Sequence, residues 1–259
     1  MPVIAVVNRK GGSGKSTFAA HVAAWCAHQG HAVMLGDVDR QQSSRSWLRR
    51  RPAHLPVIAP WALDHNTLRV PTGISHVVLD TPGGLHGFEL ARVVMFADAI
   101  VIPVCSSMFD RESAAQCHAE LAALPRVASG RCRVGVVAMR IDGRTNHAAV
   151  MREWADAIGV PFIAALRETQ VYWRALEKGL TIFDLPAQHA ASDVAQWQSI
   201  LHWLEPVIAP AQTTNDGALH AREPAAPGQG SRLATTLARV ADQSRAAAPT
   251  LARVSSSRA

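Results

Sequence analysis

Short and almost uninterrupted apolar runs recur along the chain. Strands that are covered on both faces of a sheet show this pattern, because every one of their side chains is buried. The first run lies at the N-terminus with no preceding cations and no long apolar core, which is typical of a first strand and not of a signal peptide. The runs predict strands at 3–7, 31–35, 76–79, 100–104, 134–138 and, more weakly, 160–164.

Segments with helical spacing of apolar residues separate these runs. They lie at 16–29, 110–124, 146–158 and 192–204, and each ends before a glycine or a proline. An alternation of strands and helices builds a parallel sheet with helices on both of its faces. The predicted fold class is therefore α/β, with a mostly parallel, twisted sheet.

The character of the chain changes at about Pro206. From there Ala, Pro, Gly, Ser, Thr and Arg dominate, and residues 211–259 hold six arginines against three acidic residues. Such a composition buries too little apolar surface to fold alone. We expect one folded domain at 1–205 and a flexible basic tail at 206–259, which is either an inert linker or a weak anion-binding arm.

Charge and hydropathy limit the environment of the protein. The 259 residues carry a net charge of +6, with a sequence pI near 9.8, which suggests an anionic partner such as nucleic acid or an acidic membrane surface. No apolar run reaches the roughly 18 residues of a membrane-spanning helix. We expect a soluble, cytoplasmic protein without stable membrane insertion.

Cysteine and lysine usage adds two constraints. The four cysteines are far apart with no Cys-x-x-Cys pair, which favours free thiols over a zinc site or a redox pair. Lysine is rare: Lys10, Lys15 and Lys178 are the only three among 26 cationic side chains. Two of them lie in one glycine-rich loop, where a compact ammonium suits the chemistry better than a planar guanidinium.

That loop, residues 8–17, follows the first strand directly and precedes a helical segment. Its glycines allow backbone N–H groups to surround a phosphate, Lys15 can bridge two phosphates, and the Ser16 hydroxyl can ligate Mg²⁺. The usual phosphate-binding pattern places glycine at position 9, where this chain has Arg9.

The residues Lys10-Gly11-Gly12-x-Gly14-Lys15-Ser16 resemble the deviant Walker A motif of the ParA/MinD ATPases, and the resemblance covers about residues 1–205. It implies a P-loop NTPase fold. It also implies that Lys10 is a signature lysine, which reaches the phosphates of ATP in the partner subunit of a sandwich homodimer. The implied nucleotide-binding residues are Gly11, Gly12, Ser13, Gly14, Lys15, Ser16 and Thr17.

Two further segments resemble the same family. Asp37-Val38-Asp39 with Gln41 resembles switch I, which implies that Asp39 orients the attacking water and Asp37 supports Mg²⁺, although Arg40 replaces the usual proline. Asp80, at the end of the strand at 76–80, resembles the Walker B aspartate. The resemblance thus implies ATP and Mg²⁺ as cofactors, with Ser16, Asp37 and Asp80 near the metal and Lys10, Lys15 and Asp39 as catalytic residues. Taken alone, two aspartates at a strand end are also compatible with a helix N-cap.

Related ATPases with the same loop perform different work. Iron–sulfur relatives need cysteines arranged for a cluster that bridges the dimer, and the cysteines here have no paired spacing. Tyrosine-kinase relatives carry a tyrosine-rich tail, whereas Tyr172 is the single tyrosine here. Relatives of MinD end in an amphipathic membrane helix. Leu233, Leu237 and Val240 have helical spacing but lack bulky aromatic neighbours, so the membrane-cycling alternative is the second hypothesis.

The ParA type is the first hypothesis. It implies an ATP-bound dimer on non-specific DNA at the nucleoid, a ParB-like or cargo-adaptor protein that stimulates weak hydrolysis, and a cargo that the sequence does not identify. No helix-turn-helix segment precedes the first strand. Binding to DNA of any sequence requires cations on one surface. The candidates in and after the late strands are Arg140, Arg144, Arg167, Arg174 and Lys178.

Overall fold

A computed structural model describes residues 1–39, 41–62 and 70–209. The proposed basic tail therefore lies almost wholly outside the described residues. Within them no helix is long and apolar enough to cross a membrane. Of the four cysteines, Cys26, Cys117 and Cys132 are buried and Cys105 is half-buried, all as free thiols, which confirms that part of the sequence analysis.

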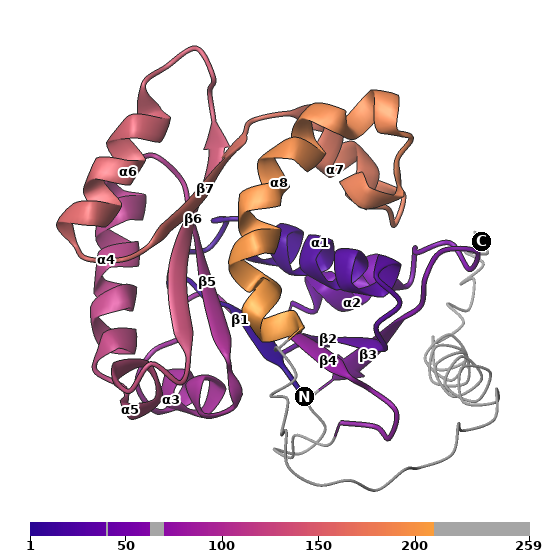
Figure 1. The fold of residues 1–259 in the computed structure, drawn as a ribbon, viewed down its shortest axis with the longest axis horizontal. Coiled ribbons are helices and arrows are strands. Elements are labelled where there is room, and N and C mark those ends of the chain that lie inside the picture. Colours follow the sequence, from indigo (N-terminus) through magenta and orange to yellow (C-terminus); the bar gives the residue numbers. More distant parts are fainter. Residues whose placement is uncertain (40, 63–69, 210–259) are drawn as a thin grey trace, which may run out of the picture.

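A seven-stranded parallel sheet forms the centre of the described domain, in the order β3-β2-β4-β1-β5-β6-β7 (Figure 1). β1 pairs with β4 and β5, so the first strand lies in the middle of the sheet. This confirms the predicted fold class. The strands are β1 (Val3–Val6), β2 (Val33–Asp37), β3 (Ile58–Ala62), β4 (His76–Asp80), β5 (Ala99–Val104), β6 (Arg133–Ile141) and β7 (Phe162–Arg167).

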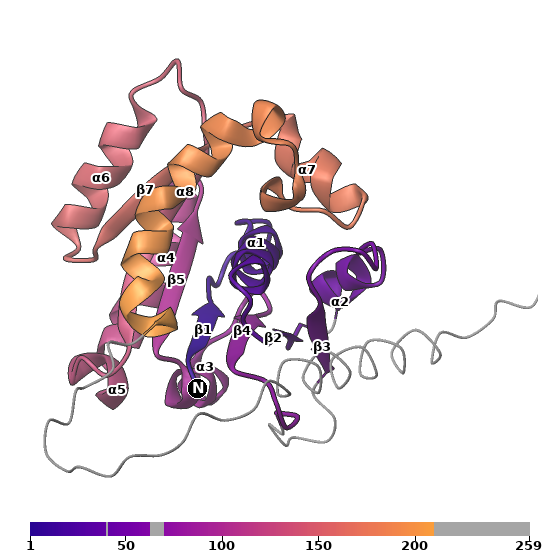
Figure 2. The same cartoon turned by 45° about the vertical axis from the view of Figure 1, so that its right-hand side comes forward.

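Helices cover both faces of the sheet (Figures 1 and 2). The elements are α1 (Lys15–His28), α2 (Ser43–Leu48), α3 (Gly87–Phe96), α4 (Met108–Ala122), α5 (Pro125–Ala128), α6 (His147–Ala157), α7 (Gln170–Glu177), the 3₁₀ turn η1 (Ile182–Asp184) and α8 (Ala187–Ile208). Alternate residues of β1 enter different core clusters. Ile4 and Val6 pack with α1 and α8, whereas Val3 and Ala5 pack with α3 and α4.

Several elements differ from the sequence-based expectation. β3 was not expected, because Pro60 interrupts its apolar run; the strand lies at the edge of the sheet, where a missing N–H is tolerated. α3 and α7 were also not expected, whereas α2 ends at the Arg49-Arg50-Arg51 run, where the sequence indicates the end of a helix. The last helix begins at Ala187 instead of 192 and continues past Pro206 to Ile208, so its end lies three residues beyond the boundary predicted at 205.

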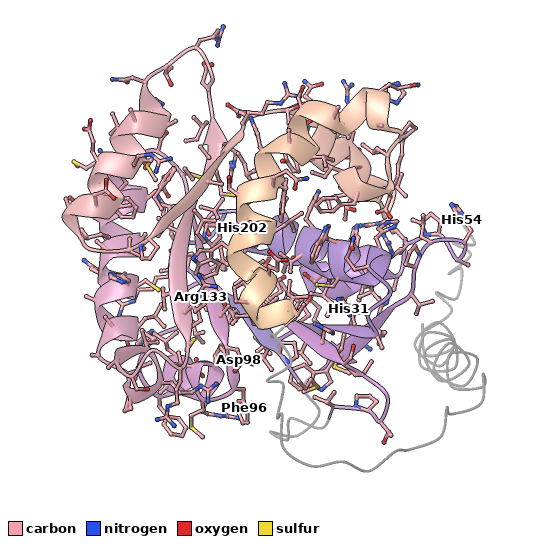
Figure 3. All side chains as sticks on the ribbon, viewed as in Figure 1. His31, His54, Phe96, Asp98, Arg133 and His202 are labelled. Atoms are coloured by element: carbon pink, nitrogen blue, oxygen red, sulfur yellow. The ribbon has the colours of Figure 1, made fainter. Side chains whose placement is uncertain are left out.

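Two arginine side chains connect elements that lie far apart in the sequence: β6 with α8, and the segment after α2 with η1. Arg133 lies on β6 (Figure 3) and donates to the Trp203 carbonyl of α8 at 2.7 Å. Its guanidinium lies 4.6 Å from the Trp203 ring. Arg51, after α2, is buried and forms hydrogen bonds of 2.9 and 3.0 Å with Asp184. Burial alone would raise the Asp184 pKa, but the hydrogen bonds from Arg51 and His28 lower it to about 2.

His21 connects α1 to the C-terminal elements. Its Nδ1–H donates to the Thr17 carbonyl at 2.7 Å, and its Nε2 accepts from the Ile182 N–H at 3.3 Å, so the neutral imidazole is fully satisfied. The ring lies 5.4 Å from that of Trp197, which also stacks on Phe18 at 4.9 Å. Complete burial lowers the His21 pKa to about 4.

Acid therefore destabilises this core. Between about pH 6.5 and 4 the unfolded chain binds a proton at His21 and the folded chain does not. The free energy of unfolding therefore decreases, by up to about 3 kcal/mol, as the pH is lowered through this range. We expect the free energy of unfolding of His21→Leu, measured in urea at pH 7.5 and 4.5, to change less with pH than that of the wild type. His189→Leu alters an exposed histidine and should retain the wild-type slope. Equal slopes for all three proteins would contradict this assignment.

Candidate functional site

The candidate site lies at the carboxyl edge of the sheet, in the loop between β1 and α1. Gly12 and Gly14 have φ values of 74° and 97°, which residues with a Cβ rarely adopt. A Cβ on Gly14 would also approach the Met139 Cε to 2.9 Å. Gly14 is the N-cap of α1 and provides no side-chain acceptor, so the first-turn N–H groups of α1 are available to an anion.

Lys15 is the inward-facing cation of the loop. Its side chain is buried and its Nζ donates to the Lys10 carbonyl at 3.0 Å. Burial lowers the Lys15 pKa, and the nearby Asp80 and Asp39 carboxylates oppose this effect. The structure thus brings Lys15 together with two of the predicted acidic residues, in a position suited to a polyphosphate.

Asn8 supports the start of the loop, a role that the sequence did not indicate. The residue is buried; its Nδ2 donates to the Pro103 carbonyl at 2.7 Å and its Oδ1 accepts from the Lys10 N–H at 3.0 Å. Asn8 therefore connects the phosphate loop to β5. Ser13 is buried too, and its Oγ has no hydrogen-bond partner among the described residues.

Asp80 lies at the end of β4, directly opposite Asp37 of β2 in the strand register. Its Oδ2 accepts from the Ser44 hydroxyl at 2.5 Å, whereas its Oδ1 is buried and has no hydrogen-bond partner in the described part of the chain. Burial raises the Asp80 pKa to about 6, and the Ser44 and Ser16 hydroxyls oppose the rise. An uncompensated buried carboxylate oxygen is unfavourable unless a cation or a proton balances it.

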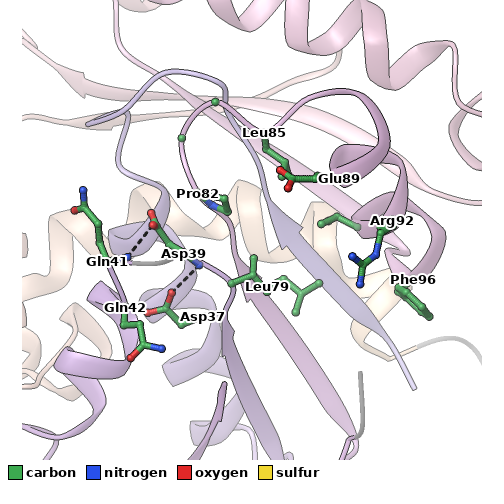
Figure 4. A pocket seen from close by; sticks show the side chains of 14 residues that line it. Asp37, Asp39, Gln41, Gln42, Leu79, Pro82, Leu85, Glu89, Arg92 and Phe96 are labelled. Atoms are coloured by element: carbon green, nitrogen blue, oxygen red, sulfur yellow. Dashed lines mark hydrogen bonds between the residues drawn. The ribbon is translucent and has the colours of Figure 1, made fainter. Parts of the chain in front are cut away.

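Asp37 and Asp39 shape the segment after β2 (Figure 4). The Asp37 Oδ1 accepts from the Asp39 N–H at 3.1 Å and its Oδ2 from the Arg45 N–H at 3.0 Å, while burial raises its pKa. The Asp39 Oδ1 accepts from the Gln41 N–H at 3.0 Å. Asp37 thus holds the segment in place through two backbone N–H groups.

These residues fit a magnesium ion. Mg²⁺ prefers hard oxygen ligands, and it is usually bound through one or two carboxylates together with substrate phosphates. The free Oδ1 of Asp80, the Ser16 hydroxyl and the Asp37 carboxylate supply this donor chemistry. Within residues 1–39, 41–62 and 70–209, no group of three or more His, Cys, Asp or Glu side chains could hold a metal.

Two adjoining cavities open at this edge. The first, about 540 Å³, is lined by Gly11, Gly12, Gly14, Lys15, Ser16, Thr17, Asp39, Gln41, Ser43, Pro82, Gly83 and Arg140. The second, about 720 Å³, lies between the segment after β2 and α3 and is lined in part by Asp37, Asp39, Leu85, Arg92 and Phe96 (Figure 4). Asp39 borders both, so its carboxylate lies between the loop and α3.

Lys10, unlike Lys15, does not line either cavity. Its Nζ forms an ion pair of 2.8 Å with Asp110 in the first turn of α4, and 39% of its side chain is exposed. Burial would raise the Asp110 pKa, but the ion pair with Lys10 and the hydrogen bond with Ser107 lower it. The loop therefore holds one lysine inside the pocket and one at its rim, next to the cavity-lining Gly11 but paired outside the cavity. Asp110 was not singled out from the sequence.

Arg9, which replaces the usual glycine, has a structural role. Its guanidinium pairs with Glu120 of α4, and the Glu120 Oε1 accepts from the Gly87 N–H at 2.5 Å. The Arg9 carbonyl also accepts from the Gly84 N–H at 2.5 Å. Arg9 thus links the phosphate loop to the segment after β4 and to α4.

The five predicted DNA-contacting cations lie in different surroundings. Arg140 donates to the Gly12 carbonyl of the phosphate loop. Arg144 is 90% exposed and pairs with Asp142, while Arg167 forms bonds of 2.8 and 3.0 Å with the buried Asp193. Arg174 donates to Gln170 at 2.5 Å, and Lys178 is the C-cap of α7.

Comparisons with known proteins agree with this geometry. Residues 4–182 match the family model described as the CobQ/CobB/MinD/ParA nucleotide binding domain. The chain is 33% identical over 210 residues to the maintenance of carboxysome distribution protein A of Gloeobacter kilaueensis, covering 78% of this chain and 94% of that protein. It is 27% identical over 229 residues to the chromosome-partitioning ATPase Soj of Thermus thermophilus, covering 72% and 88%.

Solved structures show the same fold. Apo McdA from Cyanothece superposes with a TM-score of 0.59 at 15% identity, covering 78% of this chain and 99% of that one. A chain of the MinC:MinD cell division protein complex of Aquifex aeolicus superposes with a TM-score of 0.55 at 18% identity, covering 75% of this chain and 94% of that one. With its glycine-rich loop, its two lysines and this match over most of the folded domain, the chain belongs to the ParA/MinD family of P-loop ATPases.

Proposed function

We propose that this protein is a Mg²⁺-dependent ATPase that forms an ATP-dependent sandwich dimer, binds DNA without sequence preference and positions a cargo. The observation that carries the proposal is the opposite placement of the two loop lysines. Lys15 is buried in the pocket, whereas Lys10 lies at its rim and is partly exposed. A rim cation is suited to the phosphates of a nucleotide held by a second protomer.

Nucleotide binding uses the groups already present in the pocket. The first-turn N–H groups of α1 donate to the phosphates, and Lys15 exchanges the Lys10 carbonyl for a phosphate oxygen. Ser16 and Asp80, with support from Asp37, would hold Mg²⁺, which would neutralise phosphate charge. Asp39 lies at the border of the cavity and orients the water that attacks the terminal phosphate.

Dimerisation requires a change of partner for Lys10 at the rim. Lys10 must leave Asp110 before it can contact a partner's nucleotide. Met108 and Phe109 precede Asp110 directly and are 54% and 67% exposed, so a protomer seated over the pocket would bury apolar surface beside the lysine. This supports a dimer interface that includes the rim.

DNA is the surface that we propose for the dimer. Arg174 and Lys178 lie on and after α7 and form no ion pair with a described carboxylate, whereas Arg144 and Arg167 are each paired with an aspartate. The relatives include a chromosome-partitioning ATPase and a carboxysome distribution protein, which supports a positioning role here. Partner-stimulated hydrolysis would release the dimer from its surface, and a ParB-like or adaptor protein is the proposed stimulator.

The first prediction separates binding from hydrolysis. Lys15→Ala should weaken ATP binding at least about tenfold, because it removes charge-assisted hydrogen bonds to phosphate. Asp39→Ala should bind ATP normally and hydrolyse it about 100-fold more slowly. Calorimetry measures the affinity and phosphate release measures the rate, with the exposed Asp156→Ala as the control for a lost carboxylate. Absence of ATP binding by the wild type would refute the proposed activity.

The second prediction concerns the rim lysine. In the Asp39→Ala background, ATP should double the mass measured by light scattering and ADP should not. Lys10→Ala should reduce the dimer fraction while leaving initial ATP affinity within about twofold, since its ammonium lies outside the pocket of its own subunit. Lys178→Ala is the matched control. Equal masses with ATP and ADP would exclude a nucleotide-dependent dimer.

The third prediction distinguishes DNA from a membrane. The ATP-bound dimer should bind unrelated duplexes equally, and Arg174→Gln with Lys178→Gln should weaken binding to all of them. The slope of log affinity against log salt should decrease by about 1 for each phosphate contact removed. Arg131→Gln, a change in an exposed residue before β6, should have no effect. Sedimentation with anionic liposomes and no shift of DNA would instead support the membrane-cycling alternative.

A further inference from the structure

Arg140 has a backbone conformation that requires an explanation. It is one of two non-glycine residues with positive φ in the described ranges, at 53°, and the other is Gln42. Such conformations are unfavourable by roughly 1 kcal/mol or more and persist where the surroundings enforce them, often at functional sites. Arg140 also lies within an irregularity of the β6–β7 register, between Ala138 and Ile141. The strand is therefore distorted where this side chain leaves it.

The distortion directs Arg140 toward the phosphate loop. Its guanidinium donates to the Gly12 carbonyl, and the residue lines the cavity together with Lys15, Ser16 and Thr17. The preceding residue, Met139, packs against Gly14. Two consecutive residues at the end of β6 thus lie against two glycines of the loop, and Arg140 adds to the cavity lining a side chain that the family motifs do not include.

The contact of Arg140 has the same form as that of Lys15. Each cation donates to a backbone carbonyl of the same loop: Lys15 to Lys10 and Arg140 to Gly12. Arg140 is exposed, and none of the described carboxylates forms an ion pair with it. A guanidinium carries five N–H donors in a fixed planar arrangement. It can therefore keep the Gly12 carbonyl and still offer donors to an anion in the cavity.

We propose that Arg140 is a nucleotide-binding residue whose guanidinium bridges the Gly12 carbonyl and the polyphosphate of the nucleotide in its own subunit. This deepens the proposed function, since it requires that the loop binds a nucleotide. It also assigns Arg140 to the nucleotide site instead of the DNA surface. Arg144, four residues further along and paired with Asp142, offers a matched comparison on the same segment.

Nucleotide affinity is the first test, with ADP as the probe because ADP does not drive the proposed dimer. Arg140→Gln should bind ADP about tenfold more weakly, the loss expected for one charge-assisted hydrogen bond. Arg140→Lys should lie between this variant and the wild type, because it retains the charge without the planar fork. Arg144→Gln should bind as the wild type does, and urea unfolding should give equal midpoints for all four proteins.

Chemical footprinting separates direct contact from loop positioning. ADP should protect Arg140 of the wild-type protein from phenylglyoxal, as measured by mass spectrometry, and it should leave Arg144 unprotected. Reduced affinity of Arg140→Gln without protection would mean that Arg140 acts only through Gly12 and would overturn the proposal, as would unchanged affinity. Failure of the wild type to bind ADP at all would instead refute the nucleotide site itself.

Discussion

The uncapped first turn of α1 is the constraint on which the site depends. Gly14 is in a left-handed conformation and provides no acceptor, so the N–H groups of this turn are directed at the loop with no partner from their own cap. The central position of β1, between β4 and β5, places this turn beside the ends of the neighbouring strands. Asp80, Asp37 and Asn8 are consequently brought to the same edge. An anion at this turn satisfies both the amide groups and the buried cation beside them.

The sequence predicted this arrangement well where the signal is local. The buried strands have continuous apolar runs, and the glycines and lysines of the loop all lie within residues 10–15, so both could be recognised without a structure. The contacts of Lys10 with Asp110 and of Arg9 with Glu120 could not be predicted from the sequence. Each joins the loop to a residue of α4 that lies about 100 positions further along the chain, and the polar face of α4 has no distinctive pattern. β3 was missed because its proline is tolerated only at an edge, and an edge is a property of the whole sheet.

The surface cations show a second limit of sequence reasoning. Arginines at the ends of late strands resemble one another in a sequence, yet Arg167 pairs with a buried aspartate and Arg140 reaches the phosphate loop. A guanidinium can satisfy a buried carboxylate, a backbone carbonyl or a phosphate with the same donors. Which of these partners an arginine contacts depends on local backbone geometry. The positive φ of Arg140 is an example, and the residue type does not indicate it.

The ion pair of Lys10 with Asp110 has a consequence for the encounter between two protomers. Because the ammonium is neutralised within its own subunit, the pair itself has almost no net charge with which to repel the second copy of the proposed dimer. In the proposed dimer, a nucleotide bound in each loop adds negative charge to each face, and two loaded faces would repel one another unless cations lie between them. Lys10 can supply such a cation once it leaves Asp110, so the pair is neutral while the loop is empty and offers positive charge when the partner's phosphates are near.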